Sequence, residues 1–129
     1  MSAFNKISCA AAALACAFSI GAAQAAQTRV MVMMSPGFEE GETVEILDVV
    51  RRGGSHGDAV SIAGEYVPGA HNIVIKADRV LSMEMKDLKD YEDYDMIVIP
   101  GGWTGTDHMV ADKRVIEVLK RYSKANKFI

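Results

Sequence analysis

The sequence predicts an α/β protein in which helices cover a parallel β-sheet. Residues 30–34 (VMVMM) and 96–99 (MIVI) are short, wholly apolar runs, as expected of strands that are buried on both faces of such a sheet. A proline–glycine break follows each run, and amphipathic helical patterns occupy residues 39–52 and 113–124. This alternation of buried strands and one-faced helices is typical of α/β domains.

The first helical pattern carries its own start and stop signals. Acidic residues open it, Arg51 and Arg52 close it, and Gly53 follows, which agrees with the direction of the helix dipole and with a glycine stop. We expect one apolar face, formed by Val44, Ile46, Leu47, Val49 and Val50.

Shorter elements are expected elsewhere in the chain. Asp112 is expected to cap the last helix, because its side chain can accept a hydrogen bond from a free N–H of the first turn. The remaining pattern predicts a parallel strand at 58–63, a turn at 66–69, an edge strand or hairpin arm at 71–80, a charged helical turn and loop at 82–94, a short capped turn at 106–107 and the start of another strand at 127–129.

Composition and the N-terminus limit the possible functions. The chain has 129 residues, 14 Lys and Arg against 17 Asp and Glu, and a net charge of −3, which argues against a nucleic-acid partner. Lys6, the apolar stretch at 7–20 and the small residues around Ala25 predict a secretory signal peptide over residues 1–25. We therefore expect one domain at 26–129 in the periplasm or outside the cell; a disordered, alanine-rich extension of a cytoplasmic protein is the alternative.

Cysteine and histidine positions give no sign of a metal or cofactor. Both cysteines, Cys9 and Cys16, fall within the predicted signal peptide, so residues 26–129 contain no thiol for a disulfide, a metal site or a nucleophile. His56, His71 and His108 lack the spacing of metal ligands and are expected in loops or at the surface. We predict no metal and no cofactor.

The acidic residues after the first strand are the candidates for chemistry. Glu39, Glu40 and Glu42 lie where a buried strand passes into a helix, the edge at which α/β proteins bind ligands. Glu39 and Glu40 are more simply explained as acids that complement the helix dipole. Glu42 lies beside the apolar face and is the better candidate for a buried catalytic acid.

A second candidate group follows the apolar run at 96–99. Gly101 and Gly102 could bring backbone N–H groups to a developing oxyanion, although an ordinary tight turn explains the two glycines alone more simply. Trp103 could form the wall of a substrate pocket or could be a packed aromatic residue.

These stretches resemble a known family. The run SPGFEEGETV at 35–44 with ILDVVRRG at 46–53, then IKAD at 75–78, YDMIVIPGG at 94–102 and VIE at 115–117 are similar, in order, to the first half of a ThiJ/PfpI domain. The resemblance is greatest to the branch that contains the parkinsonism-associated protein deglycase.

The resemblance implies a fold, a site and a class of activity. Members have a flavodoxin-like parallel sheet between helices, related to class I glutamine amidotransferases, and are usually dimeric. A buried glutamate, matched by Glu42, hydrogen-bonds a cysteine on a strained elbow, and Gly101 and Gly102 match the backbone beside the oxyanion site. Family activities include glyoxalase and deglycase chemistry on reactive dicarbonyls, peptidase-like hydrolysis, chaperone function and oxidative-stress protection.

The nucleophile does not fall within these 129 residues. In the family, the strand that begins like residues 127–129 continues into the elbow cysteine, so the sheet is expected to be incomplete and the chain inactive by itself. The partners implied are a small dicarbonyl or glycated substrate and a second copy in a homodimer, with no nucleic acid and no membrane after signal cleavage. The alternatives are a non-catalytic periplasmic chaperone-like or binding module, and a truncated gene product.

Overall fold

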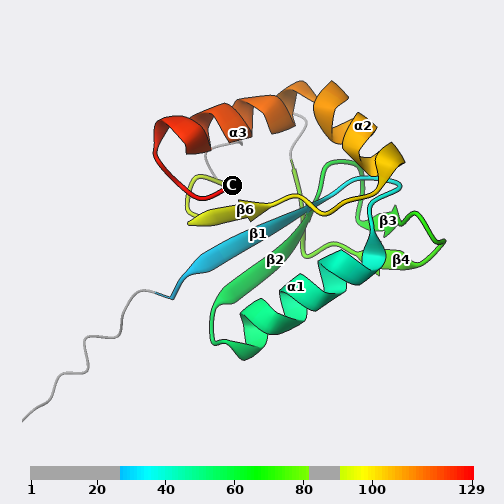
Figure 1. Ribbon diagram of the computed structural model, residues 1–129, viewed down its shortest axis with the longest axis horizontal. Coiled ribbons are helices and arrows are strands. Elements are labelled where there is room, and N and C mark those ends of the chain that lie inside the picture. The colour runs from blue at the N-terminus through cyan, green and yellow to red at the C-terminus, as the bar shows by residue number, and fades with distance from the viewer. Residues whose placement is uncertain (1–26, 82–90) are drawn as a thin grey trace, which may run out of the picture.

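A computed structural model describes residues 27–81 and 91–129, so the predicted signal peptide and most of the charged stretch at 82–94 lie outside the described residues. Figure 1 shows the sheet with helices on both of its faces. The strands are β1 (Arg29–Met34), β2 (His56–Ser61), β3 (Tyr66–Pro68), β4 (Val74–Lys76), β5 (Arg79–Val80) and β6 (Met96–Val98), and the helices are α1 (Glu40–Arg52), α2 (Trp103–Ala111) and α3 (Lys113–Lys124).

The main sheet has the order β5-β2-β1-β6, and all of its strands are parallel. The apolar β1 lies between two neighbours and pairs with β2 from Arg29 to Met34, which confirms the predicted buried strand and the predicted parallel pair. A further bridge joins Met96 to Phe128 in parallel, and Ile97 N donates to Phe128 O at 3.0 Å. The strand predicted to begin at 127–129 therefore starts alongside β6, on the side away from β1.

Side chains of β1 alternate between two hydrophobic cores. Met31 and Met33 point to the face covered by α2 and α3, where they pack with Val118 and Tyr122. Val32 points to the opposite face, which is covered by α1 and the β3–β4 hairpin. Each fully buried side chain of this kind stabilises the fold by about 1.5–3 kcal/mol, so β1 contributes to both layers at once.

Helix α1 begins and ends as the sequence predicts, but its apolar face is incomplete. Glu39 is the N-cap, and its carboxylate accepts a hydrogen bond from Glu42 N at 2.9 Å. Leu47 is buried against the sheet, whereas Val44 and Val49 are 53% and 63% exposed. The predicted face is therefore wrong at these two valines, which remain available to a partner.

The structure contains a helix that the sequence pattern did not reveal. Residues predicted as a short capped turn belong to α2, whose N-cap is Gly102 and which therefore has no side-chain cap. Asp112 caps α3 as predicted by accepting from Arg114 N at 2.8 Å. Of the helices in the described ranges, none combines the length and the apolar character needed to cross a bilayer.

The segment between β2 and β5 forms an antiparallel hairpin. Residues predicted as a turn at 66–69 include β3, which pairs with β4 in the register Tyr66↔Lys76 to Pro68↔Val74. Pro68 is accommodated because the bond across this end of the hairpin runs from Gly69 N to Ile73 O, so the missing N–H of Pro68 removes no bond to β4. The stretch predicted as one edge strand or hairpin arm at 71–80 divides into the hairpin arm β4 and the sheet-edge strand β5.

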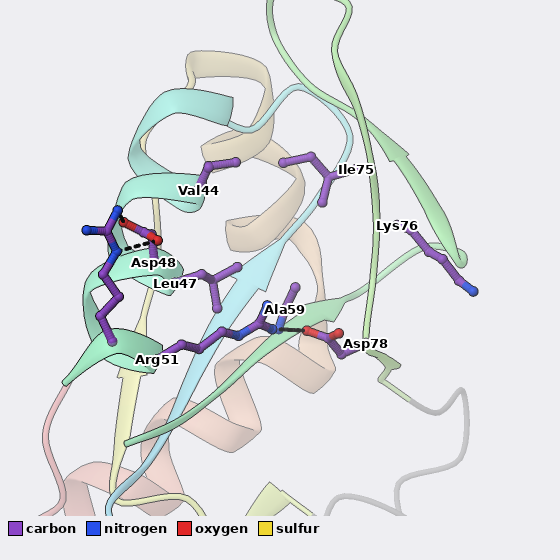
Figure 2. Close-up of a pocket in the computed structure, with 9 residues that line it drawn as sticks. Val44, Leu47, Asp48, Arg51, Ala59, Ile75, Lys76 and Asp78 are labelled. Atoms are coloured by element: carbon purple, nitrogen blue, oxygen red, sulfur yellow. Dashed lines mark hydrogen bonds and ion pairs between the residues drawn. The ribbon is translucent and has the colours of Figure 1, made fainter. Parts of the chain in front are cut away.

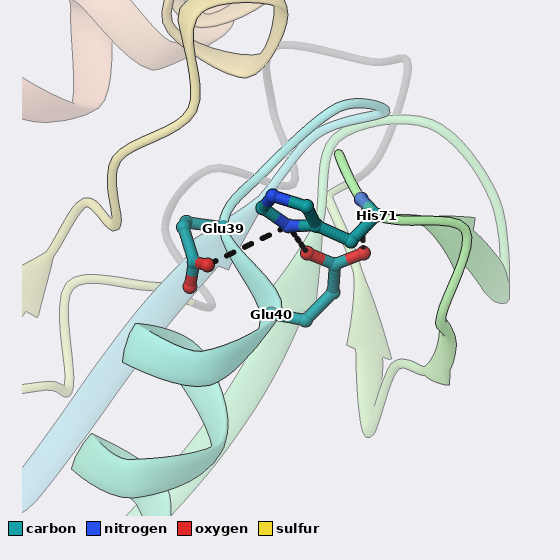
Figure 3. A group of neighbouring side chains, drawn as sticks. All are labelled: Glu39, Glu40 and His71. Carbon is teal, nitrogen blue, oxygen red and sulfur yellow. Dashed lines mark hydrogen bonds and ion pairs between the residues drawn. The ribbon is translucent and has the colours of Figure 1, made fainter.

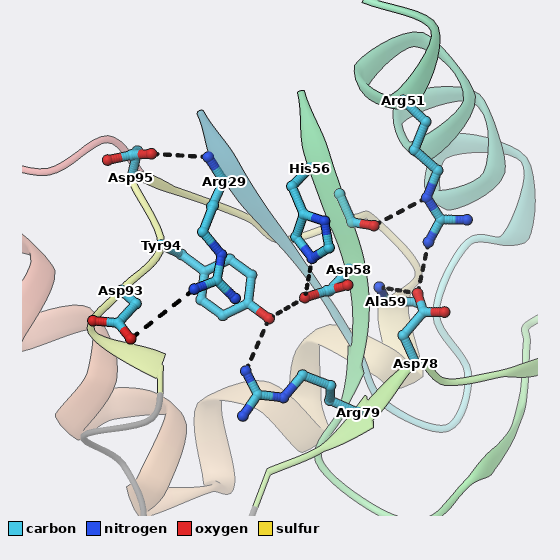
Figure 4. Close-up of polar contacts among 11 residues, drawn as sticks. Arg29, Arg51, His56, Asp58, Ala59, Asp78, Arg79, Asp93, Tyr94 and Asp95 are labelled. Carbon is cyan, nitrogen blue, oxygen red and sulfur yellow. Dashed lines mark hydrogen bonds and ion pairs between the residues drawn. The ribbon is translucent and has the colours of Figure 1, made fainter. Parts of the chain in front are cut away.

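Side chains at the amino end of the sheet form a polar network (Figure 4). Buried Asp58 accepts hydrogen bonds from the Tyr94 hydroxyl and, at 3.1 Å, from His56 Nε2. The Arg79 guanidinium donates to the same hydroxyl at 3.2 Å, and the Arg29 guanidinium lies 4.5 Å from the centre of the Tyr94 ring. Burial and the adjacent Asp58 raise the pKa of Tyr94, so its hydroxyl keeps the proton that it donates.

Candidate functional site

The candidate site lies at the carboxyl edge of the sheet, between β1 and β6. The chain leaves β1 through α1 toward β2 on one side, while β6 lies on the other side of β1. Such a switch point leaves an opening at the strand ends, and α/β proteins bind their ligands there. The two loops that border this opening are the β1–α1 turn and the β6–α2 turn.

These two loops are joined backbone to backbone. Glu39 N donates to Gly101 O at 2.9 Å, and Gly105 N donates to Gly37 O at 3.1 Å. Gly102 has φ of 102°, and a Cβ atom there would lie 2.3 Å from Gly37 O. Only glycine combines this backbone angle with so close an approach, so the sequence requirement at Gly102 is steric.

Glu42, in the first turn of α1, is joined through its side chain to the β6–α2 turn. Its Oε2 accepts a hydrogen bond from Gly101 N at 2.6 Å, a short distance typical of a charge-assisted bond. The expectation that Glu42 is buried is wrong, since the residue is exposed in the first turn of α1. Of the three acids at this end of α1, the buried one is Glu40, which is 3% exposed.

The other predicted site residues are consecutive in the β6–α2 turn and at the start of α2. Gly101 donates its N–H to Glu42, and Gly102 then caps α2. Trp103 is 93% exposed at the start of α2, so the alternative of a packed aromatic is wrong. The structure thus brings Glu42, Gly101, Gly102 and Trp103 to one edge of the sheet.

A second group of titratable side chains lies beside this edge (Figure 3). Glu40 Oε1 accepts hydrogen bonds from His71 N at 2.7 Å and Ile73 N at 3.2 Å, and His71 Nδ1 lies 3.0 Å from Glu40 Oε2. Burial alone raises the pKa of Glu40, but the hydrogen bonds from backbone N–H groups and from His71 outweigh it and lower the pKa to about 2. Sequence reasoning missed this contact because 31 residues separate the two partners.

The same contact changes His71. Its hydrogen bond to Glu40 raises the pKa of His71, and the nearby charge of Glu39 acts in the same direction. One donor atom from each of Glu39, Glu40 and His71 lies within 4.8 Å of the others, which is close enough for a divalent cation. The positive end of α1 opposes a cation here, so we describe the group as a hydrogen-bonded ion pair, and the absence of a metal stays a prediction.

A groove of about 530 Å³ lies away from these acids, between α1 and the segment from β4 to β5 (Figure 2). Leu47, Ala59 and Ile75 give it an apolar lining. At one end the Arg51 guanidinium lies 2.7 Å from the Asp78 carboxylate. The groove carries neither Glu42 nor the glycine pair, so we separate it from the candidate site.

Comparisons with known proteins agree with this architecture. A model of the DJ-1/PfpI family matches residues 28–129. The chain is 34% identical over 93 residues to the Parkinson disease protein 7 homolog of Danio rerio, which covers 71% of this chain and 47% of that protein. It is 32% identical over 100 residues to protein DJ-1 homolog B of Arabidopsis thaliana, which covers 77% of this chain and 22% of that protein. The chain therefore spans half or less of the length of these relatives.

Solved structures give the same result for the fold. Oxidized DJ-1 of Toxoplasma gondii superposes with a TM-score of 0.69 at 29% identity, over 78% of this chain and 52% of that one. DJ-1beta of Drosophila melanogaster gives 0.69 at 27% identity, over 77% and 51%. The flavodoxin-like fold predicted from the sequence is confirmed, and with a family model that matches all but the first 27 residues, the chain belongs to the DJ-1/PfpI family.

Proposed function

We propose that this chain supplies the acid/base and oxyanion-binding part of a thiol-dependent site that detoxifies reactive dicarbonyls or their adducts. The observation that carries the proposal is the 2.6 Å bond between Glu42 Oε2 and Gly101 N at the switch point of the sheet. It fixes the orientation of a carboxyl group at the edge where this fold binds ligands.

Glu42 is proposed as the proton carrier. A carboxyl group has two oxygens, so the bond from Gly101 to Oε2 can hold the group in place while Oε1 accepts a proton. The same group can return this proton later in the reaction, as a general acid. Gly101 is on this proposal a positioning residue, because its N–H is already donated to Glu42.

Gly102 is proposed as the oxyanion donor. When a thiolate adds to a carbonyl carbon, an S–C bond forms and the carbonyl oxygen takes the negative charge, which a backbone N–H can stabilise. Among the hydrogen bonds of the described residues, none uses Gly102 N. Phe128 forms a parallel bridge with Met96, so a strand that continued from it would run along β6 toward the same edge, where the family resemblance places the cysteine.

The test uses the protein purified from its native source. Its intact mass is measured first, since a mass above the 14.0 kDa of residues 1–129 reveals additional chain that could carry the thiol. Turnover of methylglyoxal and of a methylglyoxal-modified peptide is then assayed. We expect Glu42→Gln to lower kcat/KM by about 10²- to 10⁴-fold, the usual contribution of a general acid/base.

The control is Glu45→Gln, which neutralises another exposed acid of α1 without touching Gly101. It should keep wild-type kcat/KM. Equal activity of Glu42→Gln and wild type would refute the role of Glu42. Activity that survives full alkylation of the thiols would refute the thiol-dependent mechanism.

We also propose a homodimer, formed through α1 and the β3–β4 hairpin. Val44 on α1 and Ile73 and Val74 on the hairpin are more than half exposed, although they are large apolar side chains. Val44 lines the groove together with Leu47 and Ile75, and Ile73 and Val74 directly precede Ile75 in the chain. A second copy would remove this apolar surface from water. Val74→Glu should shift the sedimentation coefficient toward that of a monomer, whereas an unchanged coefficient would contradict this interface.

Export is proposed from the pattern of residues 1–25 alone. A native protein recovered from the periplasmic fraction, with an N-terminus near Ala26, would support it. A cytoplasmic protein that retains Met1 to Ala25 would exclude it.

A further inference from the structure

We propose that the contact between His71 and Glu40 is a pH-sensitive clamp. It fastens the tip of the β3–β4 hairpin, residues 69–73, to the start of α1. The clamp acts on hairpin position and is independent of any thiol chemistry. It joins two segments that are 31 residues apart in the sequence.

The geometry of the hairpin tip is the first support. Glu40 belongs to the first turn of α1 and is buried, yet its carboxylate reaches outward to the tip and receives the N–H groups of His71 and Ile73. The tip also meets the β1–α1 turn directly, since Ala70 N donates to Phe38 O at 2.8 Å and Gly37 N donates to Pro68 O at 2.8 Å. Glu40 is thus the side-chain part of a larger contact.

Close packing at Gly69 is the second support. A Cβ atom built at Gly69 would lie 2.1 Å from the Glu40 side chain, so the tip passes the carboxylate with no space between them. A shift of the Glu40 side chain toward Gly69 would therefore displace the hairpin tip. Because His71 is only two residues away, a charge on its ring acts on the same contact.

The charges that face His71 come from α1 and its N-cap. Within residues 27–81 and 91–129, Glu40 lies 3.0 Å and Glu39 3.6 Å from His71 Nδ1. The hairpin's own charged pair, Glu65 and Lys76, lies at its open end and is closed on itself at 3.1 Å. The positive charge of a protonated His71 is therefore stabilised by two carboxylates, and no cationic side chain among its described neighbours repels it.

The direction of the pH effect follows from these contacts. The pKa of His71 is raised above 6.5, so its contribution to the clamp is complete below pH 6.5 and is lost as the pH rises through the folded-state value. The pKa of Glu40 is lowered to about 2, so its contribution is complete above pH 4.5 and is lost as the pH falls toward 2. The clamp is strongest between these limits, at mildly acidic pH.

The clamp also reaches the candidate site. Glu39 faces His71, caps α1 through Glu42 N, and donates its own N–H to Gly101 O. Glu42 and Gly101 are the two partners of the site contact. Protonation of His71 is thereby coupled to the first turn of α1, which carries the candidate acid.

The first experiment is an NMR titration of the histidine rings in the full chain. We expect Glu40→Gln to lower the titration midpoint of His71, and Glu39→Gln to lower it by a smaller amount because Glu39 is farther away. If Glu40→Gln fails to fold, the change in the His71 titration midpoint caused by Glu39→Gln decides whether the carboxylates act on His71. A His71 midpoint that neither substitution moves would overturn the proposal.

The second experiment is amide hydrogen exchange, corrected for intrinsic rates, at pH 5.5 and pH 8.5. In the wild type, protection of the amides at 69–73 should fall severalfold at the higher pH. His71→Gln should remove this pH dependence and keep the fold, since the His71 side chain is 70% exposed. The matched control is His56→Gln, which breaks a histidine–carboxylate pair at the other end of the sheet and should leave the pH dependence at 69–73 unchanged.

Two results of that experiment would reject the clamp. One is equal corrected protection of residues 69–73 at both pH values in the wild type. The other is a His71→Gln variant that keeps the wild-type pH dependence.

Discussion

The two ends of the parallel sheet each bury a carboxylate beside a histidine, and they use it differently. At the amino end, Asp58 is bonded to side chains, among them the Tyr94 hydroxyl and the His56 ring. At the carboxyl end, Glu40 is bonded to the backbone N–H groups of a neighbouring hairpin as well as to His71. One carboxylate joins side chains into a fixed network, and the other holds a loop in position.

The difference extends to the surroundings. Tyr94 is fully buried, with Arg29 over its ring and Arg79 on its hydroxyl, so little at the amino end can move without breaking several contacts. At the carboxyl end Glu42 and Trp103 are exposed to solvent. The amino end is thus built for stability, and the carboxyl end presents groups to a ligand, as the location of sites in α/β folds leads us to expect.

Tyr94→Ala should produce the largest loss of stability. It removes a buried ring and leaves the Asp58 carboxylate without the hydroxyl, so we expect unfolding to become easier by about 3–5 kcal/mol. Urea denaturation at pH 7 measures the loss. The control is Tyr66→Ala, whose ring is 63% exposed and which should change stability by less than about 0.5 kcal/mol. Equal losses would remove the contrast between the two ends.

Gly69→Ala should have an intermediate effect, at the carboxyl end. The added Cβ would lie 2.1 Å from Glu40, so either the hairpin tip or the carboxylate must shift, at a cost of about 1–3 kcal/mol. Gly64→Ala is the matched control, because a Cβ there meets nothing within 4 Å. Thermal unfolding of the pair compares them, and a Gly69→Ala variant as stable as Gly64→Ala would show that the tip is loosely packed.

Glu42→Gln should have the smallest effect on stability. The residue is exposed, and the amide oxygen of Gln can still accept from Gly101 N, so we expect a change within about 0.5 kcal/mol. Chemical denaturation followed by circular dichroism is sufficient to measure it. A loss as large as that of Gly69→Ala would make Glu42 a structural residue and would weaken the division between the two ends.

Local patterns in the sequence predicted much of the fold. The apolar run of β1, the end charges and glycine stop of α1 and the Asp112 cap of α3 are signals within one element, and the structure confirms each. The strand start at Phe128 is confirmed too. These predictions succeed because burial on both faces, end charges and capping oxygens act on neighbouring residues.

The predictions that failed depend on contacts between distant residues. Helix α2 has a glycine N-cap and a glycine in its first turn, Gly105, and both weaken its helical signal. A Cβ at Gly105 would lie 2.9 Å from the Phe38 backbone, so packing requires that glycine. Glu40 rather than Glu42 is buried because the hairpin tip covers that side of α1. Helical periodicity alone could not distinguish these two acids, since the hairpin follows much later in the sequence.

The bond between Glu42 and Gly101 has a consequence for the order of folding. Its partners are 59 residues apart, and they meet only after β6 has paired with β1. Closing so long a loop is slow compared with forming a helix, so we expect α1 to form before the site contact. During synthesis the ribosome releases Glu42 well before Gly101, and a nascent chain that ends before β6 carries the acid without its backbone partner.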